Sequence, residues 1–240
     1  MPFPPNLKRV RLVRRRNRFT IEVRRDTRPA GDEKPPGDSF ALHLPNSGRM
    51  RELLQPGALG LAHMDGGEGR RTAGTLLLVR YEGRWVSVDA RMPNRLFARC
   101  VEEEALPPFL GYTVRKAEAS WGQGRVDFLL SAPEKPEFLV ETKSCNLVER
   151  GLALFPDAPT ARGTRHLNEL AEAVNQGYRA AVVWFVQRDD AQALAPHAQA
   201  DPDFARALGK ARDQGVEAYA YRCLVEPSGV TVLGEVPIVG

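Results

Sequence analysis

Apolar residues recur at nearly every second position in two stretches near the N-terminal end of the sequence, which is the period of a β-strand. Within residues 8–25 they alternate with arginines, so one face of a predicted strand pair is apolar and the other is basic. A charged loop rich in proline and glycine is expected between Arg28 and Asp38. Further short strands are predicted at 40–44, 58–63, 75–81 and 84–89. About five short strands separated by turns predict a small β-barrel.

The pattern changes near Pro93, where helical periods begin to alternate with strands. A helix is predicted at 94–105, and the continuous apolar run at 180–186 is typical of a buried central strand. A helix that ends at Gly177 is predicted from the recurrence of Leu167, Leu170, Ala171 and Val174, and another at 203–214. Further strands are predicted at 112–119, 126–130, 138–143, 216–223 and 230–236. We therefore expect an α+β protein of two domains, a barrel at residues 1–90 and an α/β domain at residues 91–240.

Charge divides the chain at nearly the same place. Residues 1–100 contain 20 Lys and Arg against 10 Asp and Glu, whereas residues 101–240 contain 14 against 20. A basic N-terminal half suits phosphate backbones, and oligonucleotide-binding barrels have the predicted strand number and size. An acidic C-terminal half suits a metal site. The charge distribution therefore indicates nucleic acid as the partner.

Cysteine usage and hydropathy indicate the compartment. Cys100, Cys145 and Cys223 are widely separated and form neither a disulfide framework nor a CxxC metal site. The N-terminal sequence lacks the apolar core of a signal peptide, and no run approaches the roughly 20 apolar residues of a membrane span. We expect a cytoplasmic protein with no membrane partner, and the sequence leaves its oligomeric state open.

Two carboxylates and a lysine interrupt runs that otherwise predict buried strands. Asp127 lies in one run, and Glu141 and Lys143 lie in the next. Because side chains alternate along a strand, Glu141 and Lys143 share a face, and a turn at 132–137 would place Asp127 beside them. Such carboxylates can hold Mg²⁺, with Mn²⁺ as a substitute, for phosphodiester hydrolysis. The alternative is structural, with Asp127 capping a turn and the other two solvated on an edge strand.

Six segments carry a resemblance to a known family. They are HLPNSG (43–48), PNRL (93–96), GRVDF (124–128), VETKS (140–144), LFPDAPT (154–160) and RGTRHL (162–167). Together they resemble the sugar fermentation stimulation protein A family over nearly the whole chain. The resemblance implies an oligonucleotide-binding barrel joined to a restriction-endonuclease-like domain of the PD-(D/E)xK nuclease class.

The resemblance also implies roles for single residues. Asp127 and Glu141 take the places of the metal-binding acids and Lys143 that of the catalytic lysine, although Val126 replaces the proline of the PD pair. An upstream acid often completes such sites, and two residues are available for it, Glu103 and Glu118. The implied function is a Mg²⁺-dependent nuclease acting on DNA. The alternative is a non-catalytic DNA-binding regulator of sugar metabolism genes that retains the nuclease fold.

Three residues that follow the catalytic strand are expected to border the same cleft. Arg162 would bind phosphate at a helix start, where backbone N–H groups also favour anions. Asp157 and His166 would line the cleft beside it. The alternatives are that Asp157 only shapes a turn between two prolines and that His166 only borders the packed face of its helix.

The densest basic run is predicted to bind nucleic acid. Its members are Arg9, Arg11, Arg14, Arg15, Arg16 and Arg18. No acidic residue interrupts the run before Glu22, and Phe19 offers a stacking platform, although such runs are usually solvated faces. Asn46 lies in a tight turn that could also meet a phosphate. The three tryptophans, Trp85, Trp121 and Trp184, are expected to pack in the core.

Overall fold

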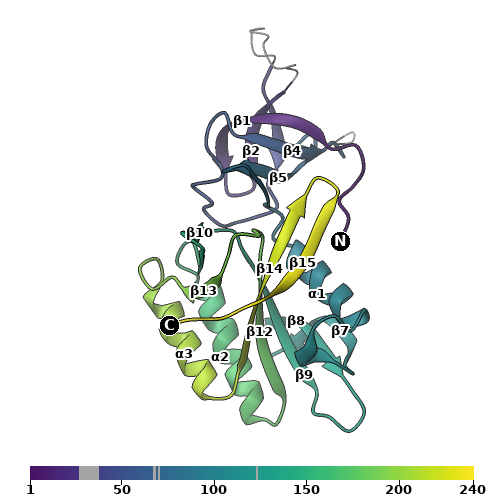
Figure 1. The fold of residues 1–240 in the computed structure, drawn as a ribbon, viewed down its shortest axis with the longest axis vertical. Coiled ribbons are helices and arrows are strands. Elements are labelled where there is room, and N and C mark those ends of the chain that lie inside the picture. Colours follow the sequence, from purple (N-terminus) through teal and green to yellow (C-terminus); the bar gives the residue numbers. More distant parts are fainter. Residues whose placement is uncertain (27–37, 67–68, 70, 123) are drawn as a thin grey trace. The chain divides into compact units, whose positions relative to one another are not determined.

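The structure is a computed structural model that describes residues 1–240 apart from 27–37, 67–68, 70 and 123 (Figure 1). The chain forms two compact units, which are described separately. The N-terminal unit contains Pro2–Arg91 and Leu224–Thr231, and the C-terminal unit contains Met1, Met92–Cys223 and Val232–Gly240. The loop predicted between Arg28 and Asp38 lies, apart from Asp38, outside the described residues.

The N-terminal unit is a closed β-barrel. Its strands are β1 (Lys8–Asn17), β2 (Thr20–Arg25), β3 (Phe40–His43), β4 (Leu59–His63), β5 (Thr75–Tyr81) and β6 (Arg84–Ser87). They form one sheet in the order β3-β2-β1-β4-β5-β6, and β3 also pairs with β5. That pairing closes β1 to β5 into a barrel, which confirms the prediction from the alternating pattern, while β6 extends the sheet beyond β5.

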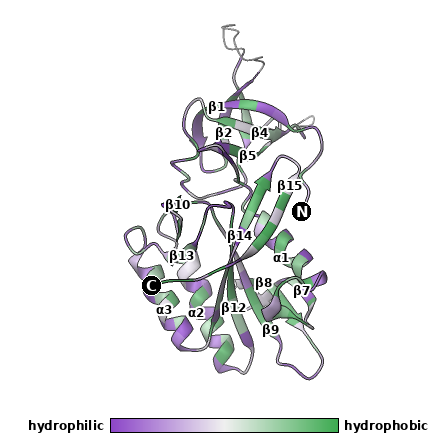
Figure 2. Ribbon diagram, in the orientation of Figure 1, coloured by the Kyte–Doolittle hydropathy of each residue, from purple (hydrophilic) through white to green (hydrophobic). Residues whose placement is uncertain are grey.

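The barrel core is formed by the apolar residues of the alternating pattern. Val10 and Leu12 of β1 are buried with Ile21 and Val23 of β2, and Figure 2 shows hydrophilic residues interleaved with hydrophobic ones along β1. Gly60 lets β4 approach this core, because a Cβ atom there would lie only 2.8 Å from Leu76 Cδ1. The pattern of the sequence therefore sets which strand face is buried.

The C-terminal unit is built on a six-stranded mixed sheet in the order β15-β14-β12-β9-β8-β7. Its strands are β7 (Thr113–Trp121), β8 (Gly124–Ser131), β9 (Phe138–Cys145), β12 (Arg179–Val186), β14 (Glu217–Glu226) and β15 (Gly229–Val236). β12 runs parallel to β9 and β14, whereas β8 pairs antiparallel with β7 and β9. A smaller sheet contains β10 (Val148–Glu149), β11 (Leu152–Phe155) and β13 (Ala193–Pro196).

Helices cover both faces of this sheet. They are α1 (Met92–Glu102), the short 3₁₀ helix η1 (Pro107–Phe109), α2 (Ala161–Asn175) and α3 (Pro202–Asp213). Phe97 of α1 packs on Phe128 of β8, which pairs with Val140, whereas Leu167 of α2 shares a core with Leu139. Because neighbouring residues of a strand point to opposite faces, α1 and α2 lie on opposite sides of β9.

One buried carboxylate fixes the starts of two helices. The Thr160 hydroxyl oxygen accepts a hydrogen bond from Gly163 N at 3.0 Å and caps α2, and Asp201 Oδ1 accepts from Phe204 N at 3.0 Å and caps α3. Asp201 Oδ2 also accepts from Thr160 N at 2.7 Å. This contact holds the first turn of α2, where Arg162 lies, in place relative to α3.

The predicted two-domain α+β fold class is confirmed, with differences at the ends of elements. The helix predicted at 94–105 is observed at Met92–Glu102, and the short strands β10, β11 and β13 were not predicted. Trp184 is fully buried as expected, whereas Trp85 is only half-buried. Among the described residues, no helix is both long enough and apolar enough to cross a bilayer.

Candidate active site

The hairpin of β8 and β9 opens where its first carboxylate lies. Backbone pairing runs through Leu130↔Phe138, Leu129↔Leu139 and Phe128↔Val140 and stops before Asp127. There the Asp127 side chain replaces the missing backbone partner, because its Oδ2 accepts from Thr142 N at 2.8 Å and from the Thr142 hydroxyl at 2.9 Å. The carboxylate therefore lies between the two strands at the point where they separate.

Glu141 and Lys143 lie together on the face of β9 that α2 covers. Lys143 Nζ is 2.6 Å from Glu141 Oε1, and both side chains are largely buried. His166, on α2, is 4% exposed and contacts the same Glu141 oxygen through Nδ1. Glu141 and Lys143 share a strand face, as alternation indicates, and His166 contacts Glu141. The role of His166 in lining a cleft stays a prediction.

Arg162 extends this cluster by one more hydrogen bond. Its Nε–H donates to His166 Nε2 at 3.3 Å, across the four-residue spacing that brings side chains together on a helix face. A ring nitrogen that accepts carries no proton, so the His166 proton lies on Nδ1 and points at Glu141. Lys143 Nζ, 3.4 Å from Nδ1, is then a close neighbour of the ring. The chain of contacts runs from Glu141 through His166 to an exposed arginine.

The two carboxylates have opposite pKa shifts. Burial raises the pKa of Asp127 above its ordinary value, the negative charge of Glu141 raises it further, and the Thr142 donors oppose this only in part. Burial would also raise the pKa of Glu141, but the Lys143 ammonium and the His166 contact outweigh it and lower the value to about 2. Asp127 is therefore the carboxylate whose charge is less well compensated by the protein.

The donor set fits a hard divalent cation. Within the part of the chain that the structure describes, no three His, Cys, Asp or Glu side chains are grouped to hold a metal ion. Mg²⁺, however, commonly binds through one or two carboxylates and keeps several waters. Asp127 and Glu141 supply the two carboxylates, and the uncompensated charge on Asp127 is what a cation would neutralise. The residues present fit the ion.

The two residues expected to supply an upstream acid lie in surface ion pairs. Glu103 follows the end of α1 and binds Arg99 at 2.7 Å, and its side chain is 51% exposed. Glu118 binds Arg125 at 3.1 Å and is 73% exposed. No described contact joins either of them to the cluster around Glu141. Which of the two would act as a third acid stays a prediction.

Two family models together match most of the chain. The model described as "Sugar fermentation stimulation protein RE domain" matches residues 91–229, and the model described as "SfsA N-terminal OB domain" matches residues 13–88. The chain belongs to the sugar fermentation stimulation protein family. The resemblance carried by the six sequence segments is confirmed, and so is the combination of an oligonucleotide-binding-type barrel with a restriction-endonuclease-like domain.

Relatives in the sugar fermentation stimulation protein family align over nearly their whole length. A homologue from Moorella thermoacetica is 43% identical over 236 residues, which is 98% of this chain and 97% of the relative. A homologue from Symbiobacterium thermophilum is 44% identical, with 96% and 94% covered. The solved structure of SfsA from Pyrococcus furiosus in complex with Ca²⁺ is 29% identical with a TM-score of 0.89, and covers 100% of this chain and 98% of that one.

Asn94 was missed by the sequence reasoning. Its side-chain oxygen, in the first turn of α1, lies 3.2 Å from the Thr142 hydroxyl that also contacts Asp127. Asn94 therefore reaches the opened hairpin from the face opposite Glu141. The available signal was its place in the PNRL segment, one of those that carried the resemblance to the family, but an asparagine has no distinctive metal-site spacing of its own.

Most of the basic run is paired within the barrel. Glu22 binds Arg14 and Arg16 at 2.9 and 3.0 Å, and Asp26 binds Arg9 and Arg11. Hydrogen bonds from Arg16, Ser39 and Arg14 lower the pKa of Glu22 to about 2. From the sequence, Glu22 was expected only to end the basic run. In the structure its carboxylate forms ion pairs with Arg14 and Arg16. The contact of these arginines with nucleic acid stays a prediction.

The remaining predicted binding residues of this unit lie in turns. Arg18 and Phe19 form the exposed turn between β1 and β2. Asn46 is buried, and its side-chain oxygen accepts from Gly48 N at 2.8 Å, which shapes the tight turn that was the simpler expectation. In the C-terminal unit, Asp157 lies half-buried in the loop before α2, and its place beside the cleft stays a prediction.

Arg15 is expected to be a structural residue of the barrel. Its guanidinium donates to five backbone carbonyls, those of Asn17, Arg18, Asn46, Gly48 and Arg49. We expect Arg15→Ala to destabilise the protein by about 1–3 kcal/mol, because charged hydrogen bonds are lost and carbonyls are left without a donor. The matched change Arg16→Ala removes one partly exposed arginine from Glu22, which keeps its contacts with Arg14 and Ser39, and should cost about 0–1 kcal/mol. Urea unfolding of both variants tests this, and equal costs would contradict it.

Proposed function

We propose that this protein is a Mg²⁺-dependent phosphodiesterase that cleaves nucleic acid, most directly DNA, with Mn²⁺ as a substitute ion. The observation that carries the proposal is the opened hairpin, in which Asp127 replaces a backbone partner beside Glu141 and the two carboxylates have opposite pKa shifts. Perturbed pKa values of neighbouring groups favour a functional site over a structural one. The Ca²⁺ in the Pyrococcus furiosus relative supports a preference for hard cations in the family.

Asp127 and Glu141 would hold the ion. When bound, it would supply positive charge at the non-bridging phosphate oxygens and lower the pKa of an attacking water. Lys143 would orient that water or a phosphate oxygen, since its ammonium is held at Glu141 and its side chain is still 13% exposed. The protein's own contribution is then placement, through a strand pair, a helix and one buried histidine.

His166 is proposed to position both sides of this site. Its Nδ1–H contacts the Glu141 carboxylate, and its Nε2 accepts from Arg162 Nε. Arg162 is exposed and uses Nε for this bond, so its two terminal Nη groups would suit two oxygens of one phosphate. Asp157, in the loop before α2, would line the same cleft.

The contact between His166 and Arg162 predicts non-additive kinetics. Arg162→Ala and His166→Ala should each lower kcat/KM for cleavage by about 10- to 100-fold, which is the usual effect of an outer partner of a metal site. If His166 acts by holding Arg162, the double variant should be little worse than the worse single one. Steady-state kinetics of the wild type, both single variants and the double variant on a labelled duplex give this double-mutant cycle. Effects that multiply fully would show that the two residues act independently.

A non-catalytic DNA-binding regulator is the second candidate. The observation that favours it is that Glu103 and Glu118 lie in exposed ion pairs, so that among the described residues only two acids are available for the metal. A protein of this kind would bind DNA through its barrel and keep the nuclease-like fold without turnover. Either function would be exercised in the cytoplasm, where its three cysteines, which form no disulfide in the described part of the chain, would stay reduced.

One experiment separates the two candidates. The purified protein is incubated with labelled single- and double-stranded DNA and RNA in Mg²⁺, in Mn²⁺ and in EDTA. The phosphodiesterase proposal expects cleavage of at least one substrate in either metal and none in EDTA. Binding without cleavage under every condition would favour the regulator.

A further inference from the structure

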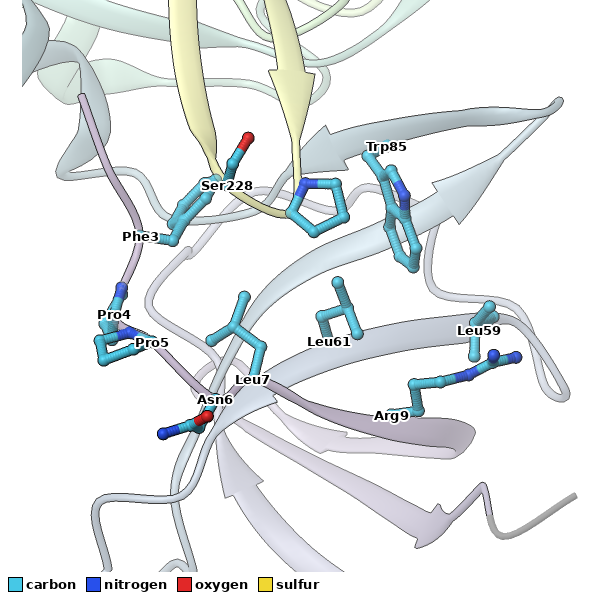
Figure 3. A pocket seen from close by; sticks show the side chains of 11 residues that line it. Phe3, Pro4, Pro5, Asn6, Leu7, Arg9, Leu59, Leu61, Trp85 and Ser228 are labelled. Carbon is cyan, nitrogen blue, oxygen red and sulfur yellow. The ribbon is translucent and has the colours of Figure 1, made fainter.

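An open groove with a volume of about 610 Å³ lies on the outer face of the barrel sheet (Figure 3). All of its lining residues belong to the N-terminal unit. Arg9, Leu61 and Trp85 line its floor from three strands, while Phe3 near the N-terminus and Pro227 at the tip of the β14–β15 hairpin line its edges. The volume lies in the range of small-molecule sites, about 300–1,000 Å³.

Strand register explains why these side chains point outward. Arg9 pairs with Leu61, and Arg80 pairs with Trp85, so the members of each pair share a face. Val10, the neighbour of Arg9, is fully buried in the barrel core, which places Arg9 on the opposite side of β1. The strands that line the groove are therefore β1, β4 and β6, and Arg80 of β5 lies on the same outer face as Trp85.

This surface combines aromatic and apolar area with positive charge. Arg80 lies over the Trp85 ring at 5.2 Å from its centroid, and Trp85 also lines the groove. Arg9 is 57% exposed and shares the buried Asp26 with Arg11, so one carboxylate serves two guanidinium groups and leaves a net positive charge. An apolar floor beside arginines that outnumber their carboxylate partner suits a flexible polyanion that carries flat rings.

We propose that this groove binds single-stranded nucleic acid, with Trp85 as the platform on which a base stacks and Arg9 and Arg80 beside the phosphates. The choice of nucleic acid as the ligand rests on the proposed function. The inference adds that the nucleic acid is single-stranded and that it binds in this groove. Base faces stack on aromatic side chains only when they are exposed, so a duplex cannot use the ring in this way. The positive charge favours this occupant over an apolar peptide.

Intrinsic fluorescence reports stacking on one ring directly. An oligothymidylate is titrated in EDTA, which prevents metal-dependent cleavage, into the wild type, Trp85→Phe and Trp121→Phe. Trp121 lies in the C-terminal unit, so its replacement is the matched control. We expect the oligonucleotide to quench the wild type and Trp121→Phe alike and to leave Trp85→Phe nearly unquenched.

Affinity supplies the second readout, by anisotropy of a labelled oligothymidylate. Trp85→Ala should weaken binding by about 5- to 150-fold, the fold-change that corresponds to loss of one stacked base. Trp85→Phe should lose much less, and the affinity for a duplex should hardly change. Thermal melting shows whether each variant is folded. If Trp85→Ala is unfolded, the affinity of Trp85→Phe is used in its place.

The outcomes distinguish the groove from the wider proposal. The proposal for the groove alone would be overturned if the wild type binds the oligothymidylate, Trp85→Ala binds it with equal affinity, and the fluorescence of Trp85→Phe is still quenched. A wild type that binds no nucleic acid of any kind would overturn the proposed function as well. Unchanged oligonucleotide affinity together with quenching of Trp85 by a proline-rich peptide would assign the groove to a peptide instead.

Discussion

Glu141→Gln is expected to abolish metal-dependent cleavage while nucleic-acid binding remains. The substitution removes the negative charge that would hold the cation but keeps a side-chain oxygen for Lys143 and His166, so the local packing should survive. The loss should exceed the roughly 10- to 100-fold cost of removing an outer partner, because Glu141 would contact the metal itself. Cleavage of a labelled duplex in Mg²⁺, followed over enzyme concentration, gives the size of the effect.

Contaminating nuclease is the main alternative explanation for any activity, so the control must be purified identically. Glu149→Gln makes the same chemical change at an exposed position of β10 and should cleave as the wild type does. Activity that persists in Glu141→Gln at the level of Glu149→Gln would assign the cleavage to another protein or another site. Loss in both variants would indicate that the change of charge alone is responsible.

Asp127→Asn is expected to stabilise the protein without metal and to remove its stabilisation by metal. Burial and the charge of Glu141 raise the pKa of Asp127 on folding, so the folded state binds this proton more tightly than the unfolded chain does. The stability contributed by the protonated form is present below the unfolded pKa of about 3.9 and is lost as pH rises through the raised folded value. At neutral pH the ionised carboxylate therefore costs stability, and asparagine removes that cost.

Melting temperatures in EDTA and in Mg²⁺ measure both effects. In EDTA at neutral pH, Asp127→Asn should melt above the wild type, and the difference should disappear as pH falls toward the unfolded pKa. In Mg²⁺ at a hundredfold excess over Kd, the wild type should gain about 2.7 kcal/mol, or roughly 5–10 °C for a chain of this size, and the variant almost nothing. An equal Mg²⁺ response in both proteins would place the cation elsewhere.

Local periodicity was sufficient to predict the elements that hold the candidate active site. Alternation placed Glu141 and Lys143 on one face of a strand, and the 3.6-residue period placed Leu167 and Leu170 on the buried face of α2. Both results depend only on which neighbours along the chain share a face. The first two barrel strands were predicted for the same reason, since their apolar residues nearly alternate.

Contacts that depend on strand register could not be predicted in the same way. Arg14 lies opposite Glu22 only because two bulges shift the pairing of β1 with β2, and the sequence does not mark where a bulge falls. Trp85 was expected in the core because a four-residue strand does not show which of its two faces is buried. Asn94 comes from the other face of the sheet, nearly fifty residues before Thr142, and nothing local connects the two.

The membership of Leu224–Thr231 in the N-terminal unit has a consequence for how the protein is made. Phe3 N donates to Ser228 O, and Pro2 forms an isolated bridge with Gly229, so segments that are far apart in sequence bond to each other in this unit. Domains usually fold in order of synthesis, the N-terminal one first. Here the barrel strands can close early, but their outer groove gains its Pro227 edge only after the intervening strands and helices, β7 to β14, have been synthesised.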